Sequence, residues 1–231
     1  MGFLDLNNNG ENEENQNNEI ESLIELGTEK KSNSKNIPKD IQFLTIIGEI
    51  EGHTVSPPQK KATKYEHIIP LLISAMEDPN IKGIFIILNT IGGDVEAGLA
   101  LAEMINSIDK PKVSLVLGGG HSIGVPLATA TDYSFIVPSA SMTIHPIRTT
   151  GLVISGPQTF RYFEKMQQRI INFILRTSKV DKKVLMELMY ATDEIANDVG
   201  TILIGQEAVD CGLIDKVGGF SEAMKKLKTL F

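Results

Sequence analysis

The chain has 231 residues, of which 42% are hydrophobic, and its formal net charge is −7 at pH 7. A chain of this length and composition can bury one sizeable core, and its negative charge argues against nucleic acid or an anionic membrane surface as a partner. The single cysteine, Cys211, excludes an internal disulfide framework and suits a reducing compartment. Because neither a signal-like N-terminus nor a long apolar run is present in the sequence, we expect a soluble cytoplasmic protein.

The first part of the chain differs in composition from the rest. Residues 1–37 are rich in Asn, Glu, Ser and Lys. Such a segment buries too little apolar surface to offset the entropy that it loses on ordering. We therefore predict a disordered acidic and Asn-rich tail over residues 1–37 and one folded domain over residues 38–231.

Apolar, β-branched runs alternate with segments of helical periodicity through the predicted domain. We predict strands at 43–47, 84–88, 113–117, 132–137 and 141–145. We predict helices at 65–76, 95–107, 127–130, 160–175, 182–190, 206–212 and 220–230. Residues 48–52 are expected to form a turn or a second short strand. The alternation of strands and helices indicates an α/β fold with mainly parallel strands.

Glycine-containing segments follow two of the predicted strands. Residues 89–94 and 118–120 are expected to end those strands and to lead into helices. In a parallel sheet both turns lie at the carboxyl ends of neighbouring strands, where α/β folds form their sites. Ser122 comes just after the second turn. Either it caps the helix that follows, or it is a nucleophile held on the turn.

A hydrolytic site needs a base and an oxyanion hole beside its nucleophile. Gly93 of the first turn and Ile123, directly after the serine, are the candidates to donate backbone N–H groups. Among the four histidines, His145 is the candidate base, because it ends an apolar strand and precedes a proline. A turn-stabilising or substrate-facing role suits His121 better, since neighbours in sequence such as His121 and Ser122 rarely point the same way.

Phosphate binding is the competing interpretation of a glycine-rich turn. This turn lacks the Lys-Ser/Thr pair that completes a nucleotide P-loop, and it lacks the spaced glycines of a dinucleotide fingerprint. We therefore expect no nucleotide, no other cofactor and no metal at this site.

Five segments occur here in the order and spacing of one known family: TIIGEIEGH (45–53), LNTIGGDVEAG (88–98), GGHSIG (119–124), SMTIHP (141–146) and EAVDCGLID (207–215). Through them, residues 43–217 resemble the Clp protease proteolytic subunits. The resemblance implies a spiral of ββα units, shared with the crotonase superfamily, and a protruding handle helix at 160–175. It also implies a homo-oligomeric ring whose active sites face an internal chamber and receive peptide or protein substrates.

The same resemblance implies a Ser-His-Asp peptidase. Ser122 matches the nucleophile, His145 the base, and Gly93 with Ile123 the oxyanion donors. The acid matches less directly. The residue that aligns without gaps with the aspartate of the family is Gly200. A small local insertion brings Asp198 into register, and we assign the acid to Asp198, with Asp193 as the alternative.

Three further points concern function. No ATP site is found in the sequence, so degradation of folded substrates would need a separate ATPase unfoldase as a partner. If no aspartate reaches His145, the chain could be a weakly active or non-catalytic ring that assists protein export or quality control. An acyl-CoA enzyme of the crotonase class would share the fold and the oxyanion hole, but the ordered serine and histidine would then be a coincidence.

Overall fold

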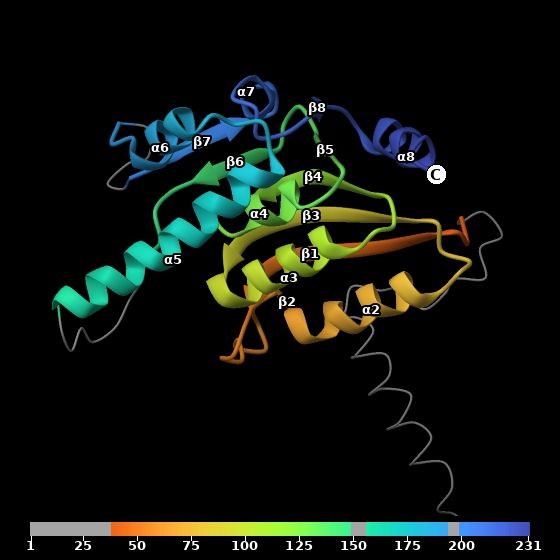
Figure 1. The fold of residues 1–231 in the computed structure, drawn as a ribbon, viewed down its shortest axis with the longest axis horizontal. Coiled ribbons are helices and arrows are strands. Elements are labelled where there is room, and N and C mark those ends of the chain that lie inside the picture. The colour runs from red at the N-terminus through yellow and green to blue at the C-terminus, as the bar shows by residue number, and fades with distance from the viewer. Residues whose placement is uncertain (1–37, 149–155, 194–198) are drawn as a thin grey trace, which may run out of the picture. The chain divides into compact units, whose positions relative to one another are not determined.

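A mostly parallel eight-stranded sheet organises the computed structural model, which describes residues 38–148, 156–193 and 199–231 (Figure 1). Its strands are β1 (Ile41–Glu51), β2 (Ala62–Lys64), β3 (Gly83–Gly93), β4 (Lys112–Gly120), β5 (Tyr133–Ile136), β6 (Ser141–Ile144), β7 (Thr201–Ile204) and β8 (Lys216–Val217). The main path runs β2-β1-β3-β4-β5-β8, with every pair parallel. Strand β6 pairs with the end of β4, and β7 pairs with β6 in the antiparallel direction.

Helices pack on both faces of this sheet. They are α2 (Tyr65–Glu77), α3 (Val95–Ser107), α4 (Gly124–Thr129), α5 (Gly156–Thr177), α6 (Lys182–Tyr190), α7 (Gln206–Asp210) and α8 (Phe220–Lys228). Every predicted helix is present, although α4 and α5 begin earlier than their periodicity indicates. The predicted tail, residues 1–37, lies outside the described residues.

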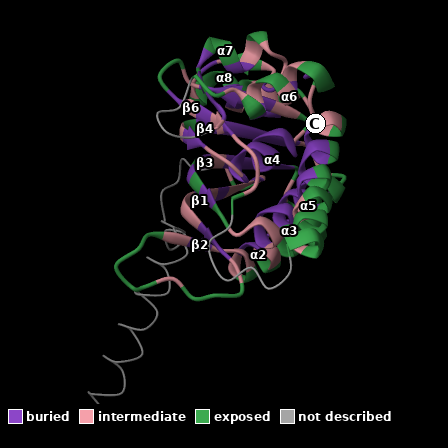
Figure 2. Ribbon diagram, turned by 90° about the vertical axis from the view of Figure 1, so that its left-hand side faces the viewer, coloured by how far each residue is buried: buried purple, intermediate pink, exposed green. Residues whose placement is uncertain are grey.

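Successive side chains of β3 enter two different cores, because side chains alternate across a strand. Ile84 and Ile86 belong to the larger core, which α2 to α7 cover. Phe85 belongs to a smaller core on the other face, where Leu227 of α8 packs against it. The purple strands between the helices in Figure 2 show this burial. A continuous apolar run in a strand buried on both faces is therefore confirmed for residues 84–88.

Two sequence-based expectations about strand ends are wrong. Residues 48–51 form neither a turn nor a separate strand but continue β1, with a register shift between Gly48 and Glu49. The glycine segments do not end their strands either, since β3 extends to Gly93 and β4 to Gly120. Pairing holds them in the sheet, because Gly93 lies opposite Ile50 and Gly120 opposite Thr90. Partners far away in sequence thus override the weak strand preference of glycine.

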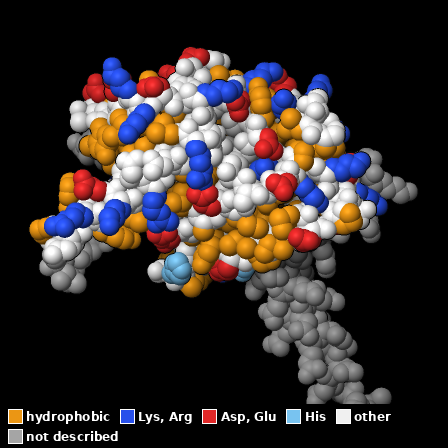
Figure 3. Space-filling view, in the orientation of Figure 1, with side chains coloured by type: hydrophobic (Ala, Val, Ile, Leu, Met, Phe, Trp, Pro, Cys, Tyr) orange, Lys and Arg blue, Asp and Glu red, His pale blue; other side chains and the backbone are white. Residues whose placement is uncertain are grey.

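Helix α5 projects from the body of the domain, as expected for a handle helix (Figure 1). Residues 156–165 are exposed or half-exposed, and fully buried positions begin at Met166. On the visible face, α5 carries Lys and Arg beside hydrophobic side chains (Figure 3). Phe160 and Tyr162 are among the exposed ones, at 65% and 55%. The mixed α/β, mostly parallel architecture that the sequence predicts is confirmed.

Candidate active site

Ser122 lies on a short turn between the end of β4 at Gly120 and the start of α4 at Gly124. Its φ is +56°, the one positive value at a non-glycine position in the described part of the chain. A residue with a Cβ rarely adopts this left-handed conformation, and such strain persists where the surroundings enforce it. The Ser122 N–H donates to the carbonyl of Thr143 at 2.9 Å, and the Ser122 carbonyl accepts from Val125 N–H at 3.0 Å.

The helix-cap alternative for Ser122 is wrong. The residue at the N-cap of α4 is Ile123, and no side chain caps that helix end by a hydrogen bond. Ser122 therefore stands before the cap, on a strand–turn–helix junction of the kind that exposes nucleophiles.

The glycines at the end of β3 let this strand approach the serine closely. A Cβ on Gly92 would lie 2.7 Å from the Cβ of Ser122, and one on Gly93 would lie 2.3 Å from the carbonyl oxygen of Ile50. Both have positive φ values, +90° and +150°. After them, the carboxylate of Asp94 accepts from Ala97 N–H at 2.8 Å and caps α3. Only glycine fits this junction between the strand and α3.

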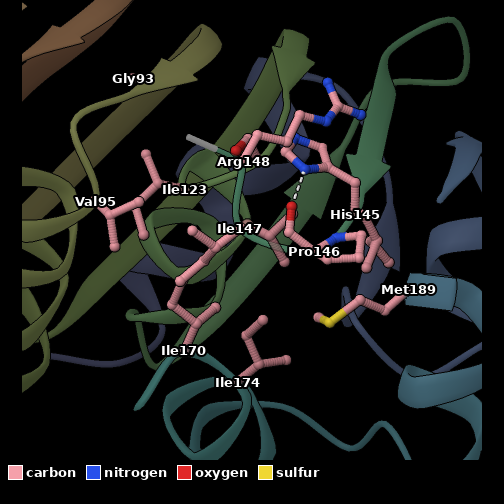
Figure 4. Close-up of a pocket in the computed structure, with 13 residues that line it drawn as sticks. Gly93, Val95, Ile123, His145, Pro146, Ile147, Arg148, Ile170, Ile174 and Met189 are labelled. Carbon is pink, nitrogen blue, oxygen red and sulfur yellow. Dashed lines mark hydrogen bonds between the residues drawn. The ribbon is translucent and has the colours of Figure 1, made fainter. Parts of the chain in front are cut away.

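One pocket of about 140 Å³ brings four of the predicted residues together: Gly93, Ser122, Ile123 and His145. Figure 4 shows the side chains that form its other walls, which are apolar except for that of Arg148. They come from the start of α3, from the segment after β6, from α5 and from α6, and include Val95, Ile147, Ile170, Ile174 and Met189. The site thus joins an apolar cavity to a serine, a histidine and two candidate backbone donors.

His145 follows the last residue of β6 and is half-buried. Its Nδ1 lies 2.7 Å from the carbonyl oxygen of Pro146 (Figure 4). On the other side, Gly200 lies against it, because a Cβ on Gly200 would lie 2.8 Å from the Cβ of His145. The Gly200 N–H donates to the carbonyl of Ala191 at 2.8 Å, which joins the residue before β7 to the residue after α6.

The two candidate acids differ in what the structure describes. Asp198 lies outside the described residues, two positions before Gly200 in the sequence. Asp193 is described and is exposed, shortly after the end of α6. The assignment of the acid to Asp198 therefore remains a prediction.

His121 lies directly beside Ser122 and is also half-buried. Its Nδ1 is 2.8 Å from the hydroxyl oxygen of Thr143. Burial lowers the pKa of His121 below its ordinary value, and repulsion from a protonated His145 lowers this pKa further. His121 is thus a neutral, hydrogen-bonded residue of the turn, which agrees with the turn-stabilising role expected from the sequence.

Sequence reasoning missed Gln167, a polar residue on the buried face of α5. Only 9% of Gln167 is exposed. Its Oε1 accepts from Ile147 N–H at 2.7 Å, and its Nε2 contacts the sulfur of Met189 at 2.9 Å. Gln167 therefore joins α5 to the segment that follows His145. The sequence does carry a sign of this residue, because Gln167 is a polar residue within a stripe of apolar residues with helical spacing.

The described residues contain no helix long and apolar enough to span a membrane. Within the same ranges, no three His, Cys, Asp or Glu side chains are grouped as a metal ion would require.

The chain is similar to known proteins over most of its length. The Clp protease family matches residues 45–220. Translocation-enhancing protein TepA of Halalkalibacterium halodurans is 52% identical over 215 residues, which cover 91% of this chain and 82% of that protein. The ATP-dependent Clp protease proteolytic subunit of Streptococcus sanguinis is 30% identical, over 65% of this chain and 76% of that subunit. The corresponding subunit of Streptococcus agalactiae is 29% identical, over 76% of this chain and 84% of that subunit. The chain therefore belongs to the Clp protease family.

Proposed function

We propose that this chain is a serine endopeptidase that cleaves peptide bonds through an acyl-enzyme on Ser122. The observation that carries the proposal is the left-handed backbone of Ser122 in a pocket shared with His145. Backbone strain of this kind concentrates at functional sites. A serine with a purely structural role needs neither the strain nor the histidine.

Peptide hydrolysis proceeds in two halves. In the first, His145 takes the proton of the Ser122 hydroxyl while the serine oxygen attacks the peptide carbonyl. The N–H groups of Gly93 and Ile123 stabilise the resulting oxyanion. His145 then protonates the leaving amine, and the acyl group remains on Ser122 as an ester. In the second half, His145 deprotonates a water molecule, which attacks the ester. The bond to the serine oxygen then breaks, His145 returns the proton to that oxygen, and the carboxylic acid leaves.

The tautomer of His145 decides which ring nitrogen acts as the base. Nδ1 lies 2.7 Å from the Pro146 carbonyl oxygen, and a carbonyl oxygen can only accept a hydrogen bond. Nδ1 therefore carries the proton, which leaves Nε2 as the atom that takes the Ser122 proton. We assign Asp198 to the acid that stabilises the imidazolium during the reaction, with Asp193 as the alternative.

The walls of the pocket suggest which peptides are cut. Valine, isoleucine and methionine side chains surround the space next to Ser122. An apolar side chain beside the scissile bond would bury its surface there, whereas a positively charged one would lose its hydration next to Arg148, which also lines the pocket. We therefore expect cleavage next to aliphatic or aromatic residues of unfolded polypeptides.

A fluorophosphonate probe tests the nucleophile. We expect the probe to label the wild-type protein on Ser122, and to label neither Ser122→Ala nor His145→Ala. The exposed Ser139 offers a matched control, because Ser139→Ala removes a serine outside the pocket and should keep full labelling. An intact wild-type oligomer that takes up no probe would refute the proposal.

We further propose that the peptidase is a homo-oligomeric ring in the cytoplasm and that an ATPase unfoldase delivers its substrates. Two matched relatives carry the name of ATP-dependent Clp protease subunits, which supports a partner of this kind. The exposed Phe160 and Tyr162 on projecting α5 support contact between copies. Analytical ultracentrifugation of the wild type and of a variant with both residues changed to Ser should show a smaller assembly for the variant.

A second candidate function is a weakly active or non-catalytic ring that assists protein export. It is favoured by the name of the 52% identical relative, a translocation-enhancing protein. Complementation separates the two candidates in a strain that lacks its own copy. Full secretion with Ser122→Ala would favour the non-catalytic role, and loss of secretion would favour the peptidase.

A further inference from the structure

Thr143 of β6 makes two hydrogen bonds to the nucleophile turn, residues 121–123. The Thr143 carbonyl accepts the N–H of Ser122 at 2.9 Å, and its hydroxyl oxygen lies 2.8 Å from Nδ1 of His121. Thr143 stands two positions before His145 on the same chain segment. Two neighbouring residues of the turn are thus bonded to one residue of the strand that leads to the candidate base.

The second bond adds a constraint that the first lacks. Backbone hydrogen bonds to Thr143 and Thr90 hold the main chain of the turn, and the bond to the Thr143 hydroxyl also fixes the His121 ring against β6. This matters because Ser122 holds a strained φ of +56°. Such a conformation persists only where the surroundings over-determine it.

The His121 ring is held on its other side by the backbone of β4. A Cβ on Gly119 would lie 2.7 Å from Nε2 of His121 and 2.8 Å from its Cδ2. The ring therefore fills the space that a side chain at residue 119 would need. Its Nδ1 faces Thr143, and the His121 N–H donates to the carbonyl of Thr90 at 3.2 Å.

We propose that His121 and Thr143 are positioning residues, which together orient Ser122 toward the strand β6 that leads to His145. The inference rests on the proposed serine-peptidase function. It assigns His121 no proton transfer and no contact with the substrate. The contact between the two side chains sets the distance and angle between nucleophile and base, on which the rate of attack depends steeply.

The neutral state of His121 suits this role. Burial lowers its pKa, and the neighbouring His145 lowers it further. A neutral imidazole does not repel the imidazolium that forms on His145 during each half-reaction. It also keeps one ring nitrogen able to accept the hydroxyl proton of Thr143.

Two substitutions of Thr143 test the contact. Thr143→Val keeps the shape of the side chain and removes the hydroxyl, whereas Thr143→Ser keeps the hydroxyl. We expect Thr143→Val to lower kcat for a peptide substrate about tenfold or more at nearly constant KM, and Thr143→Ser to retain most of the activity. An unchanged kcat in Thr143→Val, or an equal loss in both variants, would overturn the proposal.

A double-mutant cycle adds His121→Ala. If both side chains act through their mutual contact, the double variant has a kcat no lower than that of the worse single variant. Losses that multiply would contradict the proposal. Thr129→Val is the matched control, because its hydroxyl bonds to that of Thr177 at 2.8 Å, at the end of α4 away from Ser122. Its kcat should stay at the wild-type value.

The four proteins of the double-mutant cycle are the wild type, His121→Ala, Thr143→Val and the double variant. They also separate this inference from the proposed function. If the wild type hydrolyses no peptide, the proposed function fails, and urea unfolding still tests the contact. Coupling between His121→Ala and Thr143→Val in the free energy of unfolding would support the contact. Strictly additive losses would overturn it.

Discussion

Nδ1 of His145 lies 2.7 Å from the carbonyl oxygen of Pro146, the residue that follows it. The carbonyl selects the tautomer with a proton on Nδ1, a task that the triad acid performs in serine proteases. The proposed base is therefore oriented in part by the backbone of the residue that follows it. This relationship bears directly on what loss of the acid should cost.

We predict that Asp198→Asn lowers kcat about 100-fold, less than the roughly 10⁴-fold loss known where a triad acid alone holds the tautomer. The residual activity comes from the Pro146 carbonyl, which keeps Nε2 available as the base. Steady-state kinetics on a peptide with an apolar residue at the cleavage site provides the measurement.

The exposed Asp193 is the matched control for this prediction. Asp193→Asn should change kcat less than about twofold, because the exposed Asp193 is not among the residues that line the pocket. The reverse result, a large loss in Asp193→Asn with Asp198→Asn unaffected, would move the assignment of the acid to Asp193.

Gln167→Leu should destabilise the domain by about 1–3 kcal/mol, because it leaves the Ile147 N–H without its acceptor. It should also lower activity, since the segment after His145 loses its attachment to α5. Urea unfolding and peptide hydrolysis measure the two effects. Gln168→Leu, which alters the next residue of α5 on its exposed side, should change neither by much. Equal effects of the two substitutions would show that the buried contact is unimportant.

Gly200→Ala should abolish most activity. The added Cβ would lie 2.4 Å from the carbonyl oxygen of Ile144 and 2.8 Å from the Cβ of His145, at a φ of +130° that disfavours any side chain. His145 must then move. Gly156→Ala is the control, because a Cβ there meets no atom within 4 Å. Hydrolysis rates of the purified variants, with circular dichroism to confirm folding, decide the matter.

Acidification should reduce stability through His121. Its pKa is lowered in the folded protein, mainly by burial, so below the ordinary value of about 6.5 the unfolded chain binds more protons than the folded one. Stability from this residue is therefore complete above pH 6.5 and decreases as the pH falls toward 5.5. Thermal unfolding at both pH values should show a smaller decrease for His121→Asn. An identical decrease in both proteins would contradict this origin.

Some features could be read from the sequence because they depend on local pattern. The apolar run 84–88 and the helix periodicity at 95–107 gave elements that the structure contains. The extension of β3 and β4 through their glycines could not be predicted locally. It depends on pairing such as that of Thr90 with Gly120, which is fixed only once the sheet has formed.

The candidate site also has a part that local sequence predicts and a part that depends on long-range contacts. Ser122, His145, Gly93 and Ile123 were predicted from their motifs and order, and the structure places all four around one pocket. Thr143 and Gln167 have no motif, because their roles arise from contacts with residues 22 and 20 positions away in the sequence. Such contacts exist only in the folded chain.

Whether Ser122 forms an acyl-enzyme can be measured from the mass of the intact protein after brief reaction with an activated ester of an apolar acid. We expect one acyl group per chain, located on Ser122 by peptide mapping and absent from Ser122→Ala. A wild-type protein that gains no acyl group, or gains it at another residue, would contradict this expectation.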